Sequence, residues 1–290
     1  MLIQHLGRFH LSDSACRRLA QRCTEAGVAL LLVLSEVFSS NIQSTLPAFS
    51  TAARLCLTGG ALLLLGFKCL FLTRYETRGQ WAALFLTLAY TGFAALYGGD
   101  EWFLLAALVG LAAKDADLRR LARVYLAVAA AGLVLVQLLH LLTPLVPFKF
   151  YCRNWDFGYG HYNGYGARLM GVFLAWGWLR WPRLRWFDWA GLAALAVYTL
   201  TVPVCRGAGG AMLLLLALFA AQKLLPRLFE SRLYHGLVLA VYPLLTALSL
   251  LTGYLFDTAD PDHTPVLKAI DRLLSGRFEI WHNVFWQTPA

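Results

Sequence analysis

Charged residues are scarce in this chain: Asp, Glu, Lys and Arg make up 14% of its 290 residues, whereas 59% are hydrophobic. Soluble domains carry about 25% charged residues. So few charges are incompatible with a water-soluble globular enzyme and with a disordered chain, and both classes are excluded. In a membrane the relevant unit is an apolar run of roughly 20 residues, and the chain is long enough for about nine such runs.

Recognisable cysteine and nucleic-acid motifs are also lacking. The six cysteines show no Cys-x-x-Cys spacing, so they form neither a metal signature nor a redox signature. The net charge of +9 comes from short basic clusters between apolar runs, with no continuous basic face. This distribution argues against nucleic acid as a partner and is typical of the inner loops of membrane proteins. We therefore expect an all-α, polytopic integral membrane protein.

The apolar runs divide the chain into a basic N-terminal segment, 1–26, a transmembrane helical domain, 27–256, and a tail, 257–290. The runs lie at about 27–46, 51–72, 80–98, 101–113, 121–143, 165–181, 187–204, 209–225 and 234–256. The first run is too long for the apolar core of a signal peptide, so we interpret it as an uncleaved span. Nine transmembrane helices are predicted.

The distribution of basic residues predicts the orientation. With a cytoplasmic N-terminus, most of the 25 Lys and Arg residues fall on the inner side, as the positive-inside rule requires. The short run at 101–113 must cross, because otherwise the basic cluster at 114–123 would lie outside. The segment 144–164 then becomes an outer loop, and 257–290 becomes an extracytoplasmic tail.

The tail has the pattern of an amphipathic helix on the outer membrane surface. Its apolar residues recur at steps of three and four: Leu267, Ile270, Leu274, Phe278, Trp281 and Phe285. Arg277 lies at the boundary of this stripe. It is either a solvated surface arginine or, together with other outer cations, part of an anion site.

Arg206 is the most informative single residue, because it stands at the outer end of an apolar run, within VPVCRGAGG. A helix N-terminus already carries partial positive charge, so an arginine there requires an anion. Gly207, Gly209 and Gly210 leave backbone N–H groups uncovered, and helix N-termini bind phosphate through such groups. The alternative is an arginine that reaches lipid headgroups.

The outer loop ends in FGYGHYNGYG, residues 157–166, whose polar members are His161 and Asn163. His161 could act as a general base near neutral pH, or bind phosphate when protonated. The alternative is an ordinary glycine-rich turn with aromatic residues at headgroup level. Glu36 lies within the first run, where an ionisable group is either functional or held in a buried hydrogen bond between helices.

Two further groups of outer residues are weaker candidates. An acidic cluster could bind a cation but has no defined ligand geometry, so a solvated loop is the simpler interpretation; it comprises Asp257, Asp260, Asp262 and His263. Cys152 and Cys205 share the outer face and could form a disulfide in an oxidising compartment. No metal site is predicted.

Three segments, in this order and on this face, resemble the bacterial O-antigen ligase and polysaccharide polymerase family. They are FGYGHYNGYG at 157–166, CRGAGGAMLLLLALF at 205–219 and LLSGRFEIWHNVF at 273–285. The stretch VGLAAKDADLRRLARVYL at 109–126 also resembles the short fourth span and following basic loop of the family. Cys205 replaces the usual serine, and Tyr162 stands where a proline is common. Members usually continue beyond the Gly-Arg motif, so we expect a truncated or split member.

The resemblance implies glycosyl transfer at the outer face of the bacterial cytoplasmic membrane, without a cofactor. The donor would be a glycan on a polyprenyl diphosphate. An acceptor sugar hydroxyl would attack the anomeric carbon with inversion, and the lipid diphosphate would leave. Arginine suits its oxygens because the guanidinium binds them in a bidentate manner. Catalytic roles would fall to His161, Arg206 and Arg277, and substrate binding to Arg153, Asn163, Gly207, Gly209 and Gly210.

Expected partners are the lipid-linked glycan, the bilayer and other membrane proteins of glycan assembly. The rival hypotheses are a transporter or lipid-handling protein without chemistry, and a partner that controls polymer length or assembly. Clustering of the polar candidates at the outer surface favours the enzyme, because a transport pathway should place some of them near the midplane. Ligase and polymerase activities are not distinguished by the sequence, nor are the glycan and its acceptor.

Overall fold

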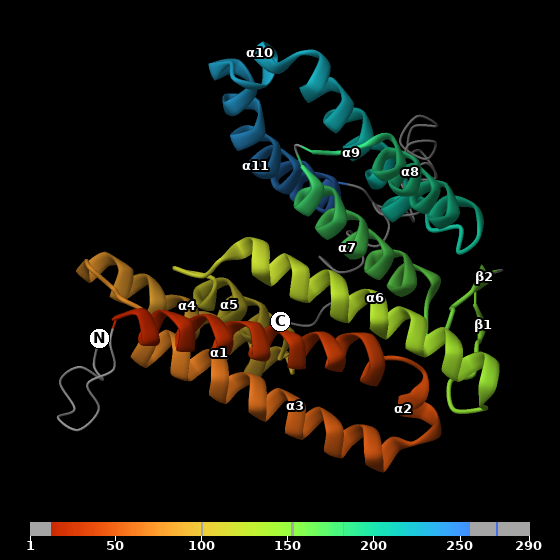
Figure 1. The fold of residues 1–290 in the computed structure, drawn as a ribbon, viewed down its shortest axis with the longest axis horizontal. Coiled ribbons are helices and arrows are strands. Elements are labelled where there is room, and N and C mark those ends of the chain that lie inside the picture. Colours follow the sequence, from red (N-terminus) through yellow and green to blue (C-terminus); the bar gives the residue numbers. More distant parts are fainter. Residues whose placement is uncertain (1–12, 100, 152–153, 182, 256–270, 272–290) are drawn as a thin grey trace. The chain divides into compact units, whose positions relative to one another are not determined.

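The structure, a computed structural model, describes residues 13–99, 101–151, 154–181, 183–255 and 271, and these residues are overwhelmingly helical (Figure 1). Its longer helices are α1 (Asp13–Val33), α3 (Pro47–Phe67), α4 (Arg78–Gly98), α5 (Trp102–Ala112), α6 (Leu118–Leu142), α7 (Tyr162–Arg180), α8 (Trp186–Thr201), α9 (Arg206–Leu224) and α11 (Arg232–Leu255). Short elements are α2 (Ile42–Thr45), α10 (Pro226–Phe229), the π-helical turns η2 (Leu34–Phe38) and η3 (Lys68–Leu72), and a hairpin of β1 (Phe150–Tyr151) and β2 (Asn154–Trp155).

A helix overlaps each of the nine predicted apolar runs, which agrees with an all-α membrane protein. Five of these helices are long and apolar enough to cross a membrane: Pro47–Leu72, Arg78–Gly98, Leu118–Leu142, Arg206–Leu224 and Arg232–Thr252. The helix α5 is apolar but has only 11 residues, and α8 has 16. Nine crossings are therefore not confirmed, although several apolar helices support a multi-pass membrane protein.

The first helix differs most from its predicted bounds of 27–46. It begins at Asp13 and continues through η2 to Phe38, and the chain then turns at residues 39–46. The polar segment is helical because one of its faces is buried, including Cys16, Cys23 and Thr24. An apolar-run criterion misses such a segment, since its other face carries arginines.

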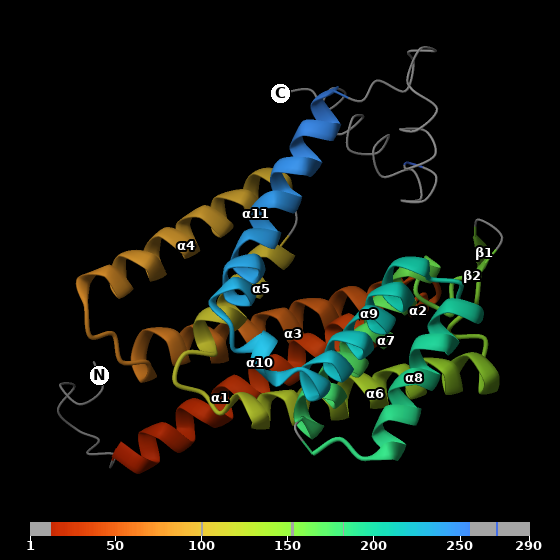
Figure 2. The ribbon, with the colours of Figure 1, turned by 90° about the horizontal axis from the view of Figure 1, so that it is seen from above.

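The chain comprises two compact units, 1–216 and 217–290, of which the first holds the well-packed core. In this unit α1 lies alongside α3 and α6, and α5 covers part of α3 (Figures 1 and 2). Leu34, Leu65, Leu105 and Ala112 belong to its buried apolar cluster. A Cβ at Gly27 would lie 2.6 Å from the Leu65 side chain, so this glycine lets α1 and α3 approach closely.

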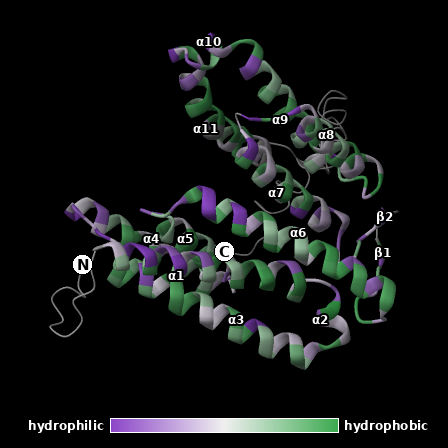
Figure 3. Ribbon diagram, in the orientation of Figure 1, coloured by the Kyte–Doolittle hydropathy of each residue, from purple (hydrophilic) through white to green (hydrophobic). Residues whose placement is uncertain are grey.

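Contacts between residues that are far apart in the sequence define two opposite ends of the first unit. At one end the backbone N–H of Asp117 donates to Gln21 (2.7 Å), and Lys68 Nζ donates to the carbonyl of Lys114. The beginnings of α1 and α6 are hydrophilic here, whereas their later parts are hydrophobic (Figure 3). The other end contains residues 39–46, the loop 143–161 and the beginning of α7. This grouping matches the predicted inner and outer segments; which end faces the cytoplasm stays a prediction.

The second unit contains the last turns of α9, then α10 and α11. Pro226 occupies the first turn of α10, where its missing N–H breaks no helical hydrogen bond. Large apolar side chains of α11 are exposed, among them Leu239 (78%) and Leu233 (69%), as expected for a helix whose neighbour is lipid. The predicted amphipathic stripe from Leu267 to Phe285 lies outside the described residues.

Candidate functional site

The loop between α6 and α7 is organised by one buried carboxylate, Asp156. Its Oδ1 accepts hydrogen bonds from the backbone N–H groups of Lys149 (2.8 Å) and Gly158 (3.0 Å). Its Oδ2 accepts one from Asn41 Nδ2 (2.7 Å). A buried charge is tolerated only when such donors surround it. Asp156 therefore closes the loop and fastens it to the segment that follows η2.

Asn41, in the turn that follows η2, makes this attachment. Besides Asp156, its Nδ2 donates to the carbonyl of Pro147 (2.7 Å), and its backbone N–H donates to the carbonyl of Gly158 (2.6 Å). These bonds hold both ends of the 147–158 loop against residues 39–41. The glycine-rich motif is thus held in place by a segment more than a hundred positions earlier in the chain.

Strained backbone lies on both sides of the candidate site. Phe157 has φ +51° and Val204 has φ +53°, values that are outliers for bulky and β-branched residues. Gly158 has φ +84°, and a Cβ there would lie 2.8 Å from Val146. Such conformations concentrate at functional sites, where the surrounding structure maintains them. Here Phe157 and Gly158 begin the first motif segment, 157–166, and Val204 directly precedes the second, 205–210.

His161 is the N-cap of α7. Its Nδ1 accepts a hydrogen bond from the backbone N–H of Asn163 (3.0 Å). A nitrogen that accepts carries no proton, so the neutral ring in this arrangement carries its proton on Nε2. His161 can therefore donate from Nε2 to an anion without disturbing the cap, whereas accepting a proton at Nδ1 would break the cap. Asn163 thus contacts His161 through its backbone N–H.

The beginning of α7 contacts the beginning of α9. Cys205 Sγ donates to Asn163 Oδ1 (3.3 Å), and a Cβ on Gly166 would lie only 2.4 Å from that sulfur. Cys205 is a buried, free thiol. The N-termini of α7 and α9 therefore lie side by side, and each brings the partial positive charge of a helix end.

Arg206 is the first residue of α9 and is exposed. Within the described part of the chain no carboxylate forms an ion pair with it. Gly207 and Gly210 face open space, but Gly209 does not: its N–H donates to the carbonyl of Cys205 (3.0 Å), and a Cβ would collide with Leu200. Gly209 thus serves helix packing, while the other two glycines leave room at the helix end.

A buried ion pair between Arg168 of α7 and Glu36 of η2 supports the beginning of α7. Arg168 Nε lies 3.3 Å from Glu36 Oε2, and its Nη1 and Nη2 donate to the carbonyls of Gly164 (3.0 Å) and Ser35 (2.7 Å). The Nε–Oε2 contact lacks hydrogen-bond alignment, so it is a charge contact only. Gly132 of α6 permits it, because a Cβ there would lie 2.5 Å from Glu36 Cβ. Glu36 is in the π-helical turn η2, a feature frequent at functional sites.

Tyr159 is buried next to this ion pair of Glu36 and Arg168. Its ring centre lies 4.3 Å from the Arg168 guanidinium, a cation–π contact. Burial, and secondarily the Glu36 charge, raise the pKa of the Tyr159 phenol, against the opposing effect of Arg168. The phenol is therefore neutral. Its oxygen is buried and makes no hydrogen bond within the described residues.

The structure thus brings together His161, Asn163 and Arg206, three of the residues singled out in the sequence. Arg153 and Arg277 lie outside the described residues, as does the acidic cluster at 257–263. Sequence reasoning missed Asn41 and Asp156, and missed Arg168 as the partner of Glu36. One signal was available for Arg168: an ionisable residue within an apolar run, such as Glu36, requires a partner of opposite charge.

Among the described residues no three His, Cys, Asp or Glu side chains come together as a metal site would require. Comparison of the chain with protein-family models, curated proteins and solved structures found no match. The family resemblance of the motifs therefore stays an expectation from the sequence.

Proposed function

We propose that the protein is a membrane glycosyltransferase that transfers or polymerises glycans from a polyprenyl diphosphate donor, in bacterial surface polysaccharide biosynthesis. The proposal places the site on the outer face of the cytoplasmic membrane, with the N-terminus in the cytoplasm. The adjacency of the α7 and α9 N-termini, with Arg206 at the second, is the observation that carries it. Two positive helix ends and a guanidinium that forms no ion pair with the described residues favour an anionic ligand with several oxygens.

The reaction needs little from the protein beyond charge and position. An acceptor hydroxyl oxygen attacks the anomeric carbon, the bond from that carbon to the diphosphate oxygen breaks, and its electron pair leaves with the diphosphate. The hydroxyl proton ends on the departing diphosphate, so the step balances. Arg206 and the Nε2–H of His161 would hold the leaving oxygens, and preorganised donors of this kind each contribute about 10²–10³ in rate.

Arg277 and Arg153 complete the proposal as further cations for the same diphosphate or its glycan, as the motif resemblance implies. The exposed aromatic hairpin supports a substrate surface nearby: Phe150 and Trp155 are packed against each other, with ring centres 5.3 Å apart. The buried pair of Glu36 and Arg168 does not favour transport, because Glu36 lies two residues before its helix ends at Phe38, away from the middle of a span.

The experiment is a transfer assay with the purified protein in proteoliposomes that contain a polyprenyl-diphosphate oligosaccharide and an acceptor glycan. Mass spectrometry then detects a new glycosidic bond. We expect transfer by the wild type, a loss of at least roughly 100-fold in the Arg206→Ala variant, and full transfer by Arg183→Ala, a basic residue distant in the fold. Movement of the lipid-linked glycan across the bilayer without a new bond would favour a transporter instead.

A further inference from the structure

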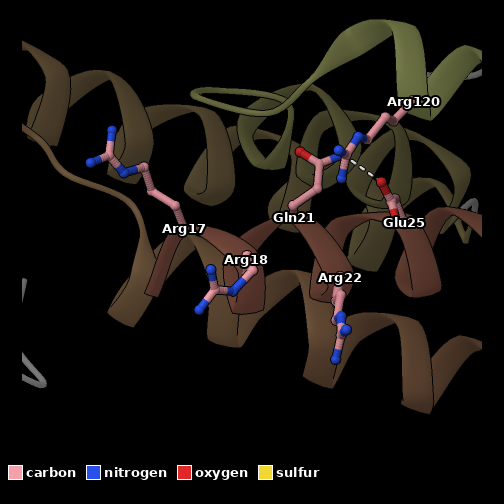
Figure 4. Close-up of a pocket in the computed structure, with 6 residues that line it drawn as sticks. All are labelled: Arg17, Arg18, Gln21, Arg22, Glu25 and Arg120. Carbon is pink, nitrogen blue, oxygen red and sulfur yellow. Dashed lines mark hydrogen bonds between the residues drawn. The ribbon is translucent and has the colours of Figure 1, made fainter. Parts of the chain in front are cut away.

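At the end opposite His161, four arginines surround a cavity of about 280 Å³. Arg17, Arg18 and Arg22 come from α1, Arg120 comes from the first turn of α6, and Gln21 and Glu25 complete the lining (Figure 4). The described lining residues carry four positive charges and one negative charge. The cavity is near the lower limit of roughly 300–1,000 Å³ for small-molecule sites, which suits a phosphate headgroup and is too small for an oligosaccharide.

Gln21 fixes the two sides of this cavity relative to each other. Its carbonyl accepts a hydrogen bond from the backbone N–H of Asp117 (2.7 Å), and its amide donates to Glu25 (2.7 Å). Asp117 caps α6 by accepting from the backbone N–H groups of Arg119 and Arg120. The beginning of α6, and Arg120 with it, is therefore held beside α1. The cavity is built by two helices and is more than a row of charges along one of them.

Among the described residues, carboxylates balance only part of the positive charge of the cavity. Arg120 contacts Asp117 (3.3 Å), but the three arginines of α1 form no ion pair within the part of the chain that the structure describes. They fan out from the helix (Figure 4), as like charges do. A phosphate would relieve this repulsion, and guanidinium groups bind its oxygens in a bidentate manner.

The position of the cavity indicates which phosphate it takes. Gln21 is bonded to the segment that joins α5 to α6, and Lys114 of this segment donates to the carbonyl of Arg74 (2.9 Å), just beyond η3. The cavity thus lies where apolar helices end, which in a multi-pass membrane protein is the level of the lipid headgroups. We propose that it binds the phosphate of an anionic phospholipid, in the leaflet opposite the candidate catalytic site. Basic pockets between helices on the cytoplasmic side recognise lipid headgroups in this way.

The test uses the full chain in detergent, with short-chain phosphatidylglycerol as the probe and phosphatidylcholine as the neutral comparison. We expect saturable binding of phosphatidylglycerol only. The Arg17→Gln, Arg18→Gln, Arg22→Gln triple variant should bind about 100-fold more weakly, given roughly fivefold per arginine. A control with the same charge change outside the cavity, Arg78→Gln, Arg119→Gln, Arg123→Gln, should change affinity less than about threefold. Equal weakening in both would mean diffuse attraction and overturn the proposal.

A second variant tests the site without removing its cations. Glu25→Gln keeps a hydrogen-bond partner for Gln21 but removes the one negative charge among the described lining residues, so phosphatidylglycerol should bind more tightly, by about fivefold. Glu76→Gln, outside the cavity, should leave affinity unchanged. Unchanged or weaker binding in Glu25→Gln contradicts the proposal. Competition by inorganic phosphate at the same concentration as the lipid would refute the lipid as ligand and indicate a soluble phosphate.

Discussion

Replacing Arg168 by methionine removes the cation that stabilises Glu36 while keeping much of the side-chain volume. The Glu36 side chain is 3% exposed and that of Arg168 is 17% exposed, so the carboxylate would be left buried without its partner. Breaking a buried pair by removing one member costs about 3–5 kcal/mol. We expect this loss in the free energy of unfolding of Arg168→Met.

Glu36→Gln should cost less, about 1–2 kcal/mol, because Arg168 keeps its hydrogen bonds to the carbonyls of Gly164 and Ser35. In the double variant Glu36→Gln, Arg168→Met the losses should be less than additive by about 1–3 kcal/mol. The physical reason is that the second substitution removes the unpaired charge created by the first.

The measurement is equilibrium unfolding of the purified protein in detergent, followed by tryptophan fluorescence. Arg120→Met is the control, because its pair with Asp117 has side chains 60% and 49% exposed and should contribute at most about 1 kcal/mol. An Arg168→Met loss no larger than that of the control would refute the reasoning. Strict additivity in the double variant would show that the two charges do not interact.

Gly158→Ala should destabilise the protein by about 1–3 kcal/mol, since its φ is +84° and a Cβ would meet Val146, whereas Gly92→Ala, in open space, should not; thermal unfolding compares them. In a cysteine-free background, a membrane-impermeant maleimide applied from outside should label Trp155→Cys and not Arg119→Cys, and the reverse would invert the proposed orientation. Transfer should survive EDTA, because side chains and helix ends neutralise the diphosphate; a loss restored by Mg²⁺ would contradict this.

The sequence predicted the helices well, because each apolar run is local information. It placed the first helix wrongly at 27–46, since burial of Cys16, Cys23 and Thr24 on one face of a polar segment is decided by α3, α5 and α6. The local sequence pattern does not show that this face is buried. The number of membrane crossings was likewise not established by the sequence. The positive-inside rule requires α5 to cross, but this apolar helix has only 11 residues and is not long enough to span a membrane by its length alone.

The sequence identified polar residues of the candidate site but not the residues that hold them in place. His161, Asn163 and Arg206 stood out because polar residues beside glycines and apolar runs are conspicuous. Asn41 and Asp156 are 115 positions apart, and no local spacing links them. The role of Gly209 could not be read from the sequence either, because a glycine that packs against Leu200 and one that faces open space are the same letter.

Binding of a polyprenyl diphosphate, without glycan, to the purified protein tests the proposed diphosphate site directly. We expect saturable binding, weakened at least about tenfold by Arg206→Ala and less by Arg206→Lys, which keeps charge but loses the planar fork. Arg183→Ala should bind as the wild type does. Equal affinity in the wild type and Arg206→Ala would contradict a diphosphate site at the adjoining ends of α7 and α9.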